Sequence, residues 1–209
     1  MNSNVNDQLG AGLVYEDLVS MRWRKAESEI QPAQLIRINE SNEEILRFIS
    51  VLDDYQSEST GDGRGTSTGD TSRIEHKVNL ILDMVSQILI NHIDMPTPVQ
   101  IRMSATGIQW RCDERLEVGQ NVLMDIYFYN NYPRPITLEG KVQHIEKQGD
   151  GYNTRIIFEN MSEMVRQWLD KLIFRHHRRG IAYARQHLQE DNRGEWASQP
   201  PDDSIKDKK

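Results

Sequence analysis

The stretch "VQIRMSATGIQWRC", residues 99–112, reads as a β-hairpin and decides how the rest of the chain is interpreted. Apolar and polar side chains alternate on both sides of its centre, which is typical of strands with one buried face. Ser104, Thr106 and Gly107 lie between the two strands, where a turn needs small residues. They indicate either a plain turn or a Ser-x-x-Gly turn that offers its hydroxyl and N–H groups to a phosphate. The flanking sequence is needed to choose between these interpretations.

Further β-type segments follow the hairpin. After residue 112 the runs "NVLMDIYFY", "PITLEGKVQHIEK" and "YNTRIIFE" are rich in Val, Ile, Tyr and Phe, and turn residues separate them. Five short antiparallel strands favour a small closed barrel, because closure removes exposed strand edges. A further strand is predicted within residues 11–25, and a final helix is predicted to start at Ser162.

The composition limits the classes of function. The 209 residues carry a formal net charge of −7, which argues against binding to a nucleic-acid polymer. Cys112 is the only cysteine, so an intramolecular disulfide and a thiolate metal site are both excluded. The first residues lack the basic and apolar regions of a signal peptide, and no apolar run predicts membrane insertion. We therefore expect a cytoplasmic protein.

Two helices are predicted ahead of the hairpin. Ser41 and Glu44 form a capping box before "EEILRFISVLDDY", and Ser72 and Glu75 form another before the second helix. Residues 56–71 are small, polar or charged and are interpreted as a flexible linker. Two prolines in "DMPTP" end the second helix.

The second helix has the stronger pattern. Its apolar residues alternate by four and three positions, and β-branched residues occupy the seam, namely Ile74, Val78, Ile81, Val85 and Ile88. The same spacing continues to His92, and Leu80, Leu82 and Leu89 widen the apolar face. β-Branched residues at both seam positions favour three or four helices over two. We therefore expect a homo-oligomer, a tetramer, built by residues 72–93 with support from 42–56, in preference to packing on the neighbouring domain.

These elements predict an α+β fold with four zones. Residues 1–34 supply the N-terminal strand and its connection to the barrel, and residues 35–95 form a helical oligomerisation insert. Residues 96–188 form the small antiparallel barrel and the C-terminal helix. Residues 189–209 are polar and are interpreted as a disordered tail.

Residues 99–179 resemble the PilZ domain, a bacterial receptor module for cyclic di-GMP. The resemblance is carried by Ser104-x-x-Gly107, by "VGQNVLMDIYF" and "LEGKVQHIE", and by "RIIFENMSEMVRQWLDKLIFRHHRR". With "LVYEDLVSMRWR" first and two helices inserted, the whole chain is similar to the atypical tetrameric subgroup, in which extra helices drive assembly. This resemblance implies a PilZ-type barrel and cyclic di-GMP as the ligand.

The resemblance also implies which residues contact the ligand. Family members use an Arg-x-x-x-Arg segment before the barrel and an Asp/Asn-x-Ser-x-x-Gly turn, since guanidinium groups suit phosphate and guanine. Ser104 and Gly107 match this turn, Arg102 replaces its Asp or Asn, and Arg22 and Arg24 are the nearest substitute for the arginine pair. The pairs Arg111/Arg115 and Arg175/Arg179 have the right spacing but follow the turn, so they are interpreted as coincidences.

Two functions remain open. The first is a cyclic di-GMP receptor and adaptor that acts in second-messenger signalling through an unknown protein partner. The second is an oligomeric interaction scaffold that has lost the ligand. An enzyme is not expected, because Cys112 and the paired acids lack a catalytic partner nearby in sequence. The basic run "RHHRR" is interpreted as a helix end or a partner surface rather than a metal site, since adjacent histidines diverge on a helix.

Overall fold

The computed structural model describes four continuous parts of the chain, residues 13–26, 30–60, 93–129 and 132–197. Within its two long helices, side chains are described up to residues 51 and 181. Between residues 74 and 88 it describes separate positions, namely 74, 77, 78, 80, 81, 84, 85, 87 and 88.

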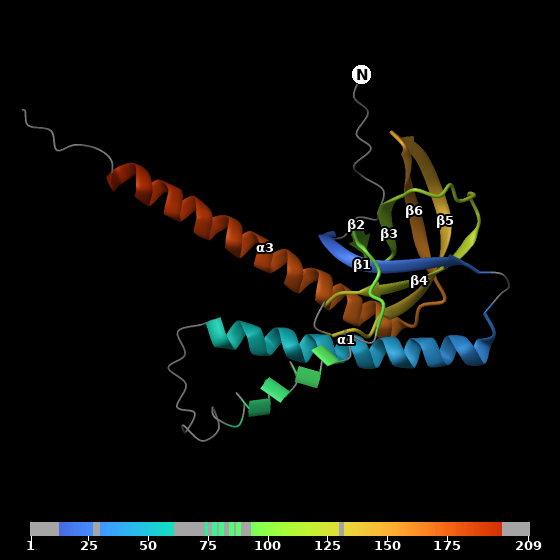
Figure 1. Cartoon of the computed structure of the whole chain (residues 1–209), viewed down its shortest axis with the longest axis horizontal. Coiled ribbons are helices and arrows are strands. Elements are labelled where there is room, and N and C mark those ends of the chain that lie inside the picture. Colours follow the sequence, from blue (N-terminus) through green and yellow to red (C-terminus); the bar gives the residue numbers. More distant parts are fainter. Residues whose placement is uncertain are drawn as a thin grey trace, which may run out of the picture.

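A closed antiparallel β-barrel lies toward one end of the structure, and helices extend beyond it (Figure 1). Its strands follow the spatial order β1-β2-β3-β6-β5-β4. Their bounds are Tyr15–Lys25 for β1, Pro98–Ser104 for β2, Gly107–Cys112 for β3, Asn121–Tyr127 for β4, Ile136–Gln148 for β5 and Gly151–Glu159 for β6. The predicted α+β class with a small antiparallel barrel is confirmed.

The first strand closes the barrel by pairing with two neighbours. Its first half pairs with β2, from Tyr15 opposite Met103 to Ser20 opposite Pro98. Its second half pairs with β4, from Ser20 opposite Tyr127 to Lys25 opposite Val122. Residues 15–25 therefore belong to the barrel, although the sequence separates them from the other strands by more than seventy residues.

The barrel interior is filled by alternate residues of each strand. Ile101 and Met103 of β2 are completely buried, as are Ile108 of β3 and Ile156 of β6. Polar side chains such as Arg102 and Gln109 occupy intervening outward positions, as the period-two pattern predicts, whereas Leu18 and Ile157 are apolar residues on the outer face. This alternation fixes which residues of the hairpin face solvent.

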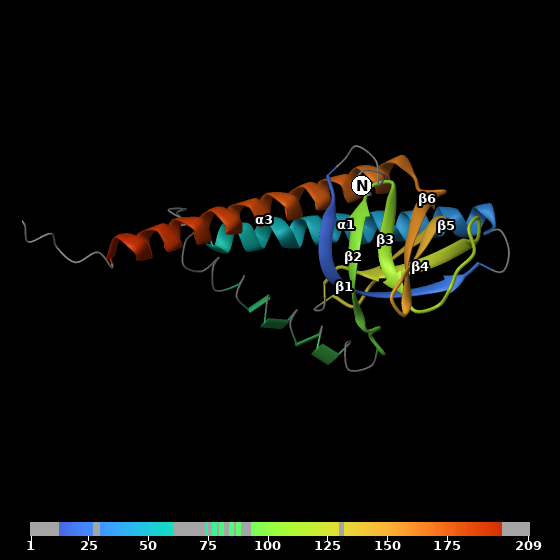
Figure 2. The same ribbon diagram turned by 90° about the horizontal axis from the view of Figure 1, so that it is seen from above.

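Helices α1 (Pro32–Thr60) and α3 (Glu163–Ala197) run side by side in the same direction and extend beyond the barrel (Figures 1 and 2). Their buried side chains join the barrel core, and they are Ile45, Leu46 and Ile49 of α1 and Val165, Leu169, Leu172 and Ile173 of α3. Polar contacts fix their register, because Asn39 accepts a hydrogen bond from Ser162 N at 2.8 Å and Arg175 donates to Ser50 O at 2.8 Å.

The helix boundaries differ from the sequence prediction. The first helix begins at Pro32, not at the predicted capping box, and Ser41 and Glu44 lie inside it. Proline is favoured in the first helical turn, and the Gln31 carbonyl accepts the Leu35 N–H at 3.0 Å. Ser-x-x-Glu is therefore not a helix start here, because an earlier start signal lets the helix run through it.

Both helices also continue further than predicted. Residues 56–60, assigned to the linker, belong to α1, and residues 189–197, assigned to the disordered tail, belong to α3. The sequence from 189 to 197 has no proline, and the first proline beyond it is at position 200. Residues 61–71 of the expected linker and 198–209 of the expected tail lie outside the described residues.

All described positions between residues 74 and 88 are helical. Their apolar side chains are exposed, with relative exposure of 63% at Ile74, 60% at Ile81 and 58% at Ile88. Ser72, Glu75, Leu82, Leu89 and His92, which entered the sequence prediction, lie outside the described residues. The described seam positions thus present apolar surface to solvent in a single chain.

Asn42 attaches α1 to the barrel. Its side-chain amide donates to the Thr137 carbonyl at 2.7 Å and accepts from the Thr137 N–H at 2.8 Å, and Asn42 is 2% exposed. The pair satisfies both backbone groups of one residue of β5. Losing it leaves these groups without partners in a buried environment.

We predict that Asn42→Ala lowers the free energy of unfolding by about 2–4 kcal/mol, because two hydrogen bonds are lost and the Thr137 N–H and carbonyl are left without partners. Glu40→Ala, on the exposed side of the same helix, is expected to change it by less than about 0.5 kcal/mol. Urea denaturation followed by circular dichroism at one protein concentration measures both values. Equal midpoints for the two variants would contradict the role of Asn42.

Candidate functional site

The turn between β2 and β3 is held by its own side chains. The Thr106 N–H donates to Ser104 Oγ at 3.2 Å, and the two hydroxyl oxygens lie 3.1 Å apart. Ser104 is 3% exposed, and the Thr106 carbonyl accepts the Phe158 N–H at 2.9 Å. The Ser104 hydroxyl therefore shapes the turn, and the Thr106 carbonyl connects the turn to β6.

Gly107 has a packing role at this turn. A Cβ atom there would collide with the Ile156 carbonyl oxygen of β6. Among the described residues, positive φ occurs at Asn160, Gly119 and Gly149, not at Gly107. Glycine is therefore required at this position for close approach of two strands rather than for an unusual backbone conformation.

A row of polar side chains crosses the outer face of the barrel next to the turn. Strand register places Glu16 opposite Arg102, Arg102 opposite Gln109, Gln109 opposite Arg155, and Arg155 opposite His144. We call Arg102, Gln109, Arg155 and His144 the outer row. Directly opposed residues share one face of a sheet, so these donors lie beside one another. The outer row thus brings two guanidinium groups, an amide and an imidazole to one face of the barrel, where Arg155 is only 8% exposed.

Arg102 of the outer row is engaged by an acid from β1. Its Nε lies 2.6 Å from Glu16 Oε1, and the two side chains are 36% and 53% exposed. Within the row, Gln109 donates to Asn153 Oδ1 of β6 at 2.9 Å. The surface is therefore preorganised by an ion pair and a hydrogen bond between neighbouring strands.

Arg22 and Arg24 lie away from this turn, in the half of β1 that pairs with β4. They pair with Asp125 and Leu123 of β4, in the second half of β1, and Arg22 donates to the Asp94 carbonyl at 3.0 Å. Arg22 is six positions along β1 from Glu16, a separation of about 20 Å in an extended strand. The five candidate residues consequently form two groups, with Arg102, Ser104 and Gly107 together and the two N-terminal arginines apart. Within one protomer, Arg22 and Arg24 therefore do not lie beside Ser104.

Three members of the outer row were not candidates from the sequence. Gln109, Arg155 and His144 come from strands β3, β6 and β5, so their proximity depends on strand order and register. The alternation in "NTRIIF" does place Arg155 outward, which is a usable signal. An irregularity between Val142 and His144 shifts the register on β5, and no local pattern indicates that shift.

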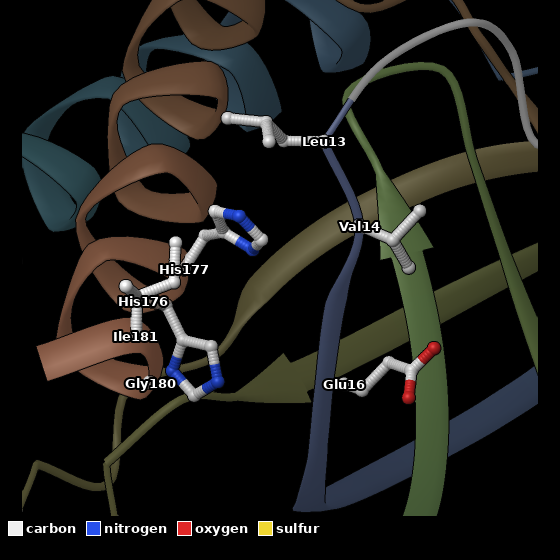
Figure 3. Close-up of a pocket in the computed structure, with 7 residues that line it drawn as sticks. All are labelled: Leu13, Val14, Glu16, His176, His177, Gly180 and Ile181. Atoms are coloured by element: carbon white, nitrogen blue, oxygen red, sulfur yellow. The ribbon is translucent and has the colours of Figure 1, made fainter. Parts of the chain in front are cut away.

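A groove of about 560 Å³ lies between β1 and α3 (Figure 3). Its walls are Leu13, Val14 and Glu16 on the β1 side and His176, His177, Gly180 and Ile181 on α3. His176 also packs on the Tyr15 ring, with centroids 4.1 Å apart, and its Nδ1 lies 4.0 Å from Asp17 Oδ2. The first histidine of "RHHRR" thus connects α3 to the barrel, and Glu16 belongs both to this groove and to the Arg102 ion pair.

Other candidate groups have structural roles. Arg175 donates to both Ser50 O and Ser50 Oγ, so this arginine joins the two helices. Burial raises the pKa of the Cys112 thiol above its ordinary value, which keeps it in the protonated and weakly nucleophilic form. None of the helices in the described parts of the chain has the length and apolar character needed to cross a bilayer.

The barrel, its flanking helices and the polar surface beside the first hairpin define a PilZ-type domain. Residues 46–186 match the family model described as "Atypical PilZ domain, cyclic di-GMP receptor". The chain belongs to this family. The suspected relationship is confirmed, and the family is described as a receptor family.

A solved structure supports the fold. It is a pathogenic protein from Xanthomonas campestris, described as a new tetrameric PilZ domain self-assembled via an unusual helical bundle. The similarity has a TM-score of 0.68 at 19% sequence identity and covers 82% of this chain and 92% of the other. A search of the curated proteins found no match.

We predict that Gly107→Ala lowers the free energy of unfolding by about 1–3 kcal/mol, because the added methyl group overpacks β3 against β6. Gly180→Ala is the matched control, since a Cβ there meets no atom within 4 Å. In a helix interior this change is expected to stabilise by about 0.5–1 kcal/mol. Thermal denaturation measures both changes, and equal melting temperatures would show that Gly107 does not serve close packing.

Proposed function

We propose that this protein is an oligomeric cyclic di-GMP receptor that passes the signal to a protein partner. The observation that carries the proposal is the outer row beside the Ser104–Gly107 turn, in a chain that belongs to a cyclic di-GMP receptor family. A second messenger must be met inside the cell, so the proposal places the protein in the cytoplasm.

The chemistry of the outer row suits such a ligand. Cyclic di-GMP carries two phosphates and two guanines, and a guanidinium group offers paired donors to phosphate oxygens or to guanine O6 and N7. Arg102, whose side chain is 36% exposed, supplies such a group at the surface of the row. Arg155 is only 8% exposed and lies on the other side of Gln109 in register. We assign Arg102, with Ser104 and Gly107 shaping the adjacent turn, as the centre of the ligand surface.

A second candidate is an interaction scaffold that does not bind the ligand. Three observations favour it: Arg22 and Arg24 lie at the far end of β1, the Ser104 hydroxyl is committed within the turn, and Glu16 engages Arg102. In this case the barrel keeps its fold and the helices provide the function through assembly. A direct binding measurement separates the two candidates.

We predict that calorimetry detects cyclic di-GMP binding at tens of micromolar ligand and that Arg102→Ala weakens it by about tenfold or more, the loss expected for charge-assisted hydrogen bonds. Arg24→Ala is the matched control, because it removes the same charge from the other end of the barrel. Its affinity should remain within about twofold of the wild type. Absence of binding by the wild type would refute the receptor and leave the scaffold.

Assembly through the helices is the other part of the proposal. The apolar residues described between 74 and 88 are exposed in one chain, at seam positions four and three apart. Burial of such a stripe is the usual driving force for bundle formation. The similar Xanthomonas protein assembles as a tetramer through a helical bundle. We therefore propose a tetramer built by residues 72–93 with support from α1, which makes 35–95 the oligomerisation insert and 96–188 the barrel and helix unit.

We predict that Ile81→Glu combined with Ile88→Glu releases protomers with a folded barrel, because charge at two seam positions cannot be buried. Lys77→Gln combined with Gln87→Glu is the control, since it changes the net charge equally at described positions outside the seam. Sedimentation equilibrium at micromolar protein reports the mass of each variant. A monomeric wild type, or an unchanged mass in the seam variant, would refute this assembly.

A further inference from the structure

We infer that the Glu16 carboxylate is an internal competitor for the ligand's phosphate at Arg102 and thereby sets the affinity of the site. This inference rests on the proposed receptor function. The carboxylate oxygen Oε1 lies 2.6 Å from Arg102 Nε, beside the turn that borders the outer row. Nothing in the family description concerns this acid, which belongs to β1 rather than to the hairpin.

The ion pair is built into the sheet. Glu16 and Arg102 are directly opposed in the β1–β2 register, so their Cβ atoms are held about 5 Å apart on the same face. A carboxylate and a phosphate use the same donor edges of a guanidinium group. A ligand phosphate that takes the Nε edge of Arg102 must therefore displace Glu16.

The strength of the pair suits a modulating role. Both side chains are more than one third exposed, and solvent screening limits such pairs to a modest contribution. Pairs of this kind alter an equilibrium by roughly 1.5- to 5-fold. Glu16 would thus reduce affinity by a small factor without blocking the site.

The displaced carboxylate has space to occupy. Glu16 also lines the groove of about 560 Å³ between β1 and α3, whose opposite wall carries His176 and His177 (Figure 3). In the structure its carboxylate is turned away from these histidines, toward β2 (Figure 3). Release from Arg102 therefore allows rotation toward a wall that bears hydrogen-bond donors, rather than burial in an apolar core.

The chain offers a matched control for removing this acid. At the other end of β1, Lys25 Nζ lies 2.6 Å from Glu114 Oε1, and these side chains are 48% and 56% exposed. Glu16→Gln and Glu114→Gln therefore each remove one exposed ion pair of the same length and raise the net charge by the same amount. Only the first change removes a carboxylate from Arg102.

The test measures cyclic di-GMP affinity by calorimetry for the wild type, Glu16→Gln, Glu114→Gln and Glu16→Gln in an Arg102→Ala background. Glu16→Gln is expected to bind roughly two- to fivefold more tightly than Glu114→Gln, and the gain should vanish when Arg102 is absent. Thermal denaturation checks that all variants are folded.

Equal affinities of Glu16→Gln and Glu114→Gln would overturn the inference and leave the receptor function intact. A gain that persists without Arg102 would also overturn it, because the effect would then be general electrostatics. Absence of binding in every variant would overturn the receptor function, and the inference with it.

Discussion

Closure of the barrel by β1 is the constraint on which the rest of the structure depends. One continuous strand pairs with β2 through its first half and with β4 through its second half, and Ser20 takes part in both pairings. Without this strand, β2 and β4 would each expose an unpaired edge. The same strand carries Glu16 to the outer row and Tyr15 and Asp17 to α3, so the positions of the outer row and of α3 both follow from its register.

Much of the fold could be predicted because strand alternation and turn residues are local signals. The hairpin at 99–112, the strand within 11–25 and the helix after Ser162 all form where the pattern indicates. The helix boundaries were predicted less well. Ser41 and Glu44 have the composition of a start signal, but Pro32 begins the helix earlier, and packing on β5 and α3 stabilises a longer α1 than its local pattern indicates.

The candidate site was predictable only where its residues are neighbours in sequence. Ser104, Gly107 and Arg102 belong to one hairpin and remain together. Arg22 was grouped with them as the nearest substitute for the family's arginine pair, but an extended strand carries it away at about 3.3 Å per residue. Arg155 and His144 join the surface through strand order and a register irregularity, which depend on long-range pairing.

Successive residues of β1 contact different parts of the molecule. Glu16 contacts Arg102 on the outer face, whereas Asp17 lies near His176 and accepts the Tyr15 hydroxyl at 3.3 Å. Contact alone does not transmit a signal, since coupling requires an element with two states that both sites influence. The Glu16–Arg102 pair, closed or opened by a phosphate, has two such states, and the groove beside it is bounded by α3. Because α3 extends beyond the barrel alongside α1, the path from this pair to the proposed assembly of residues 72–93 would run through α3 and α1.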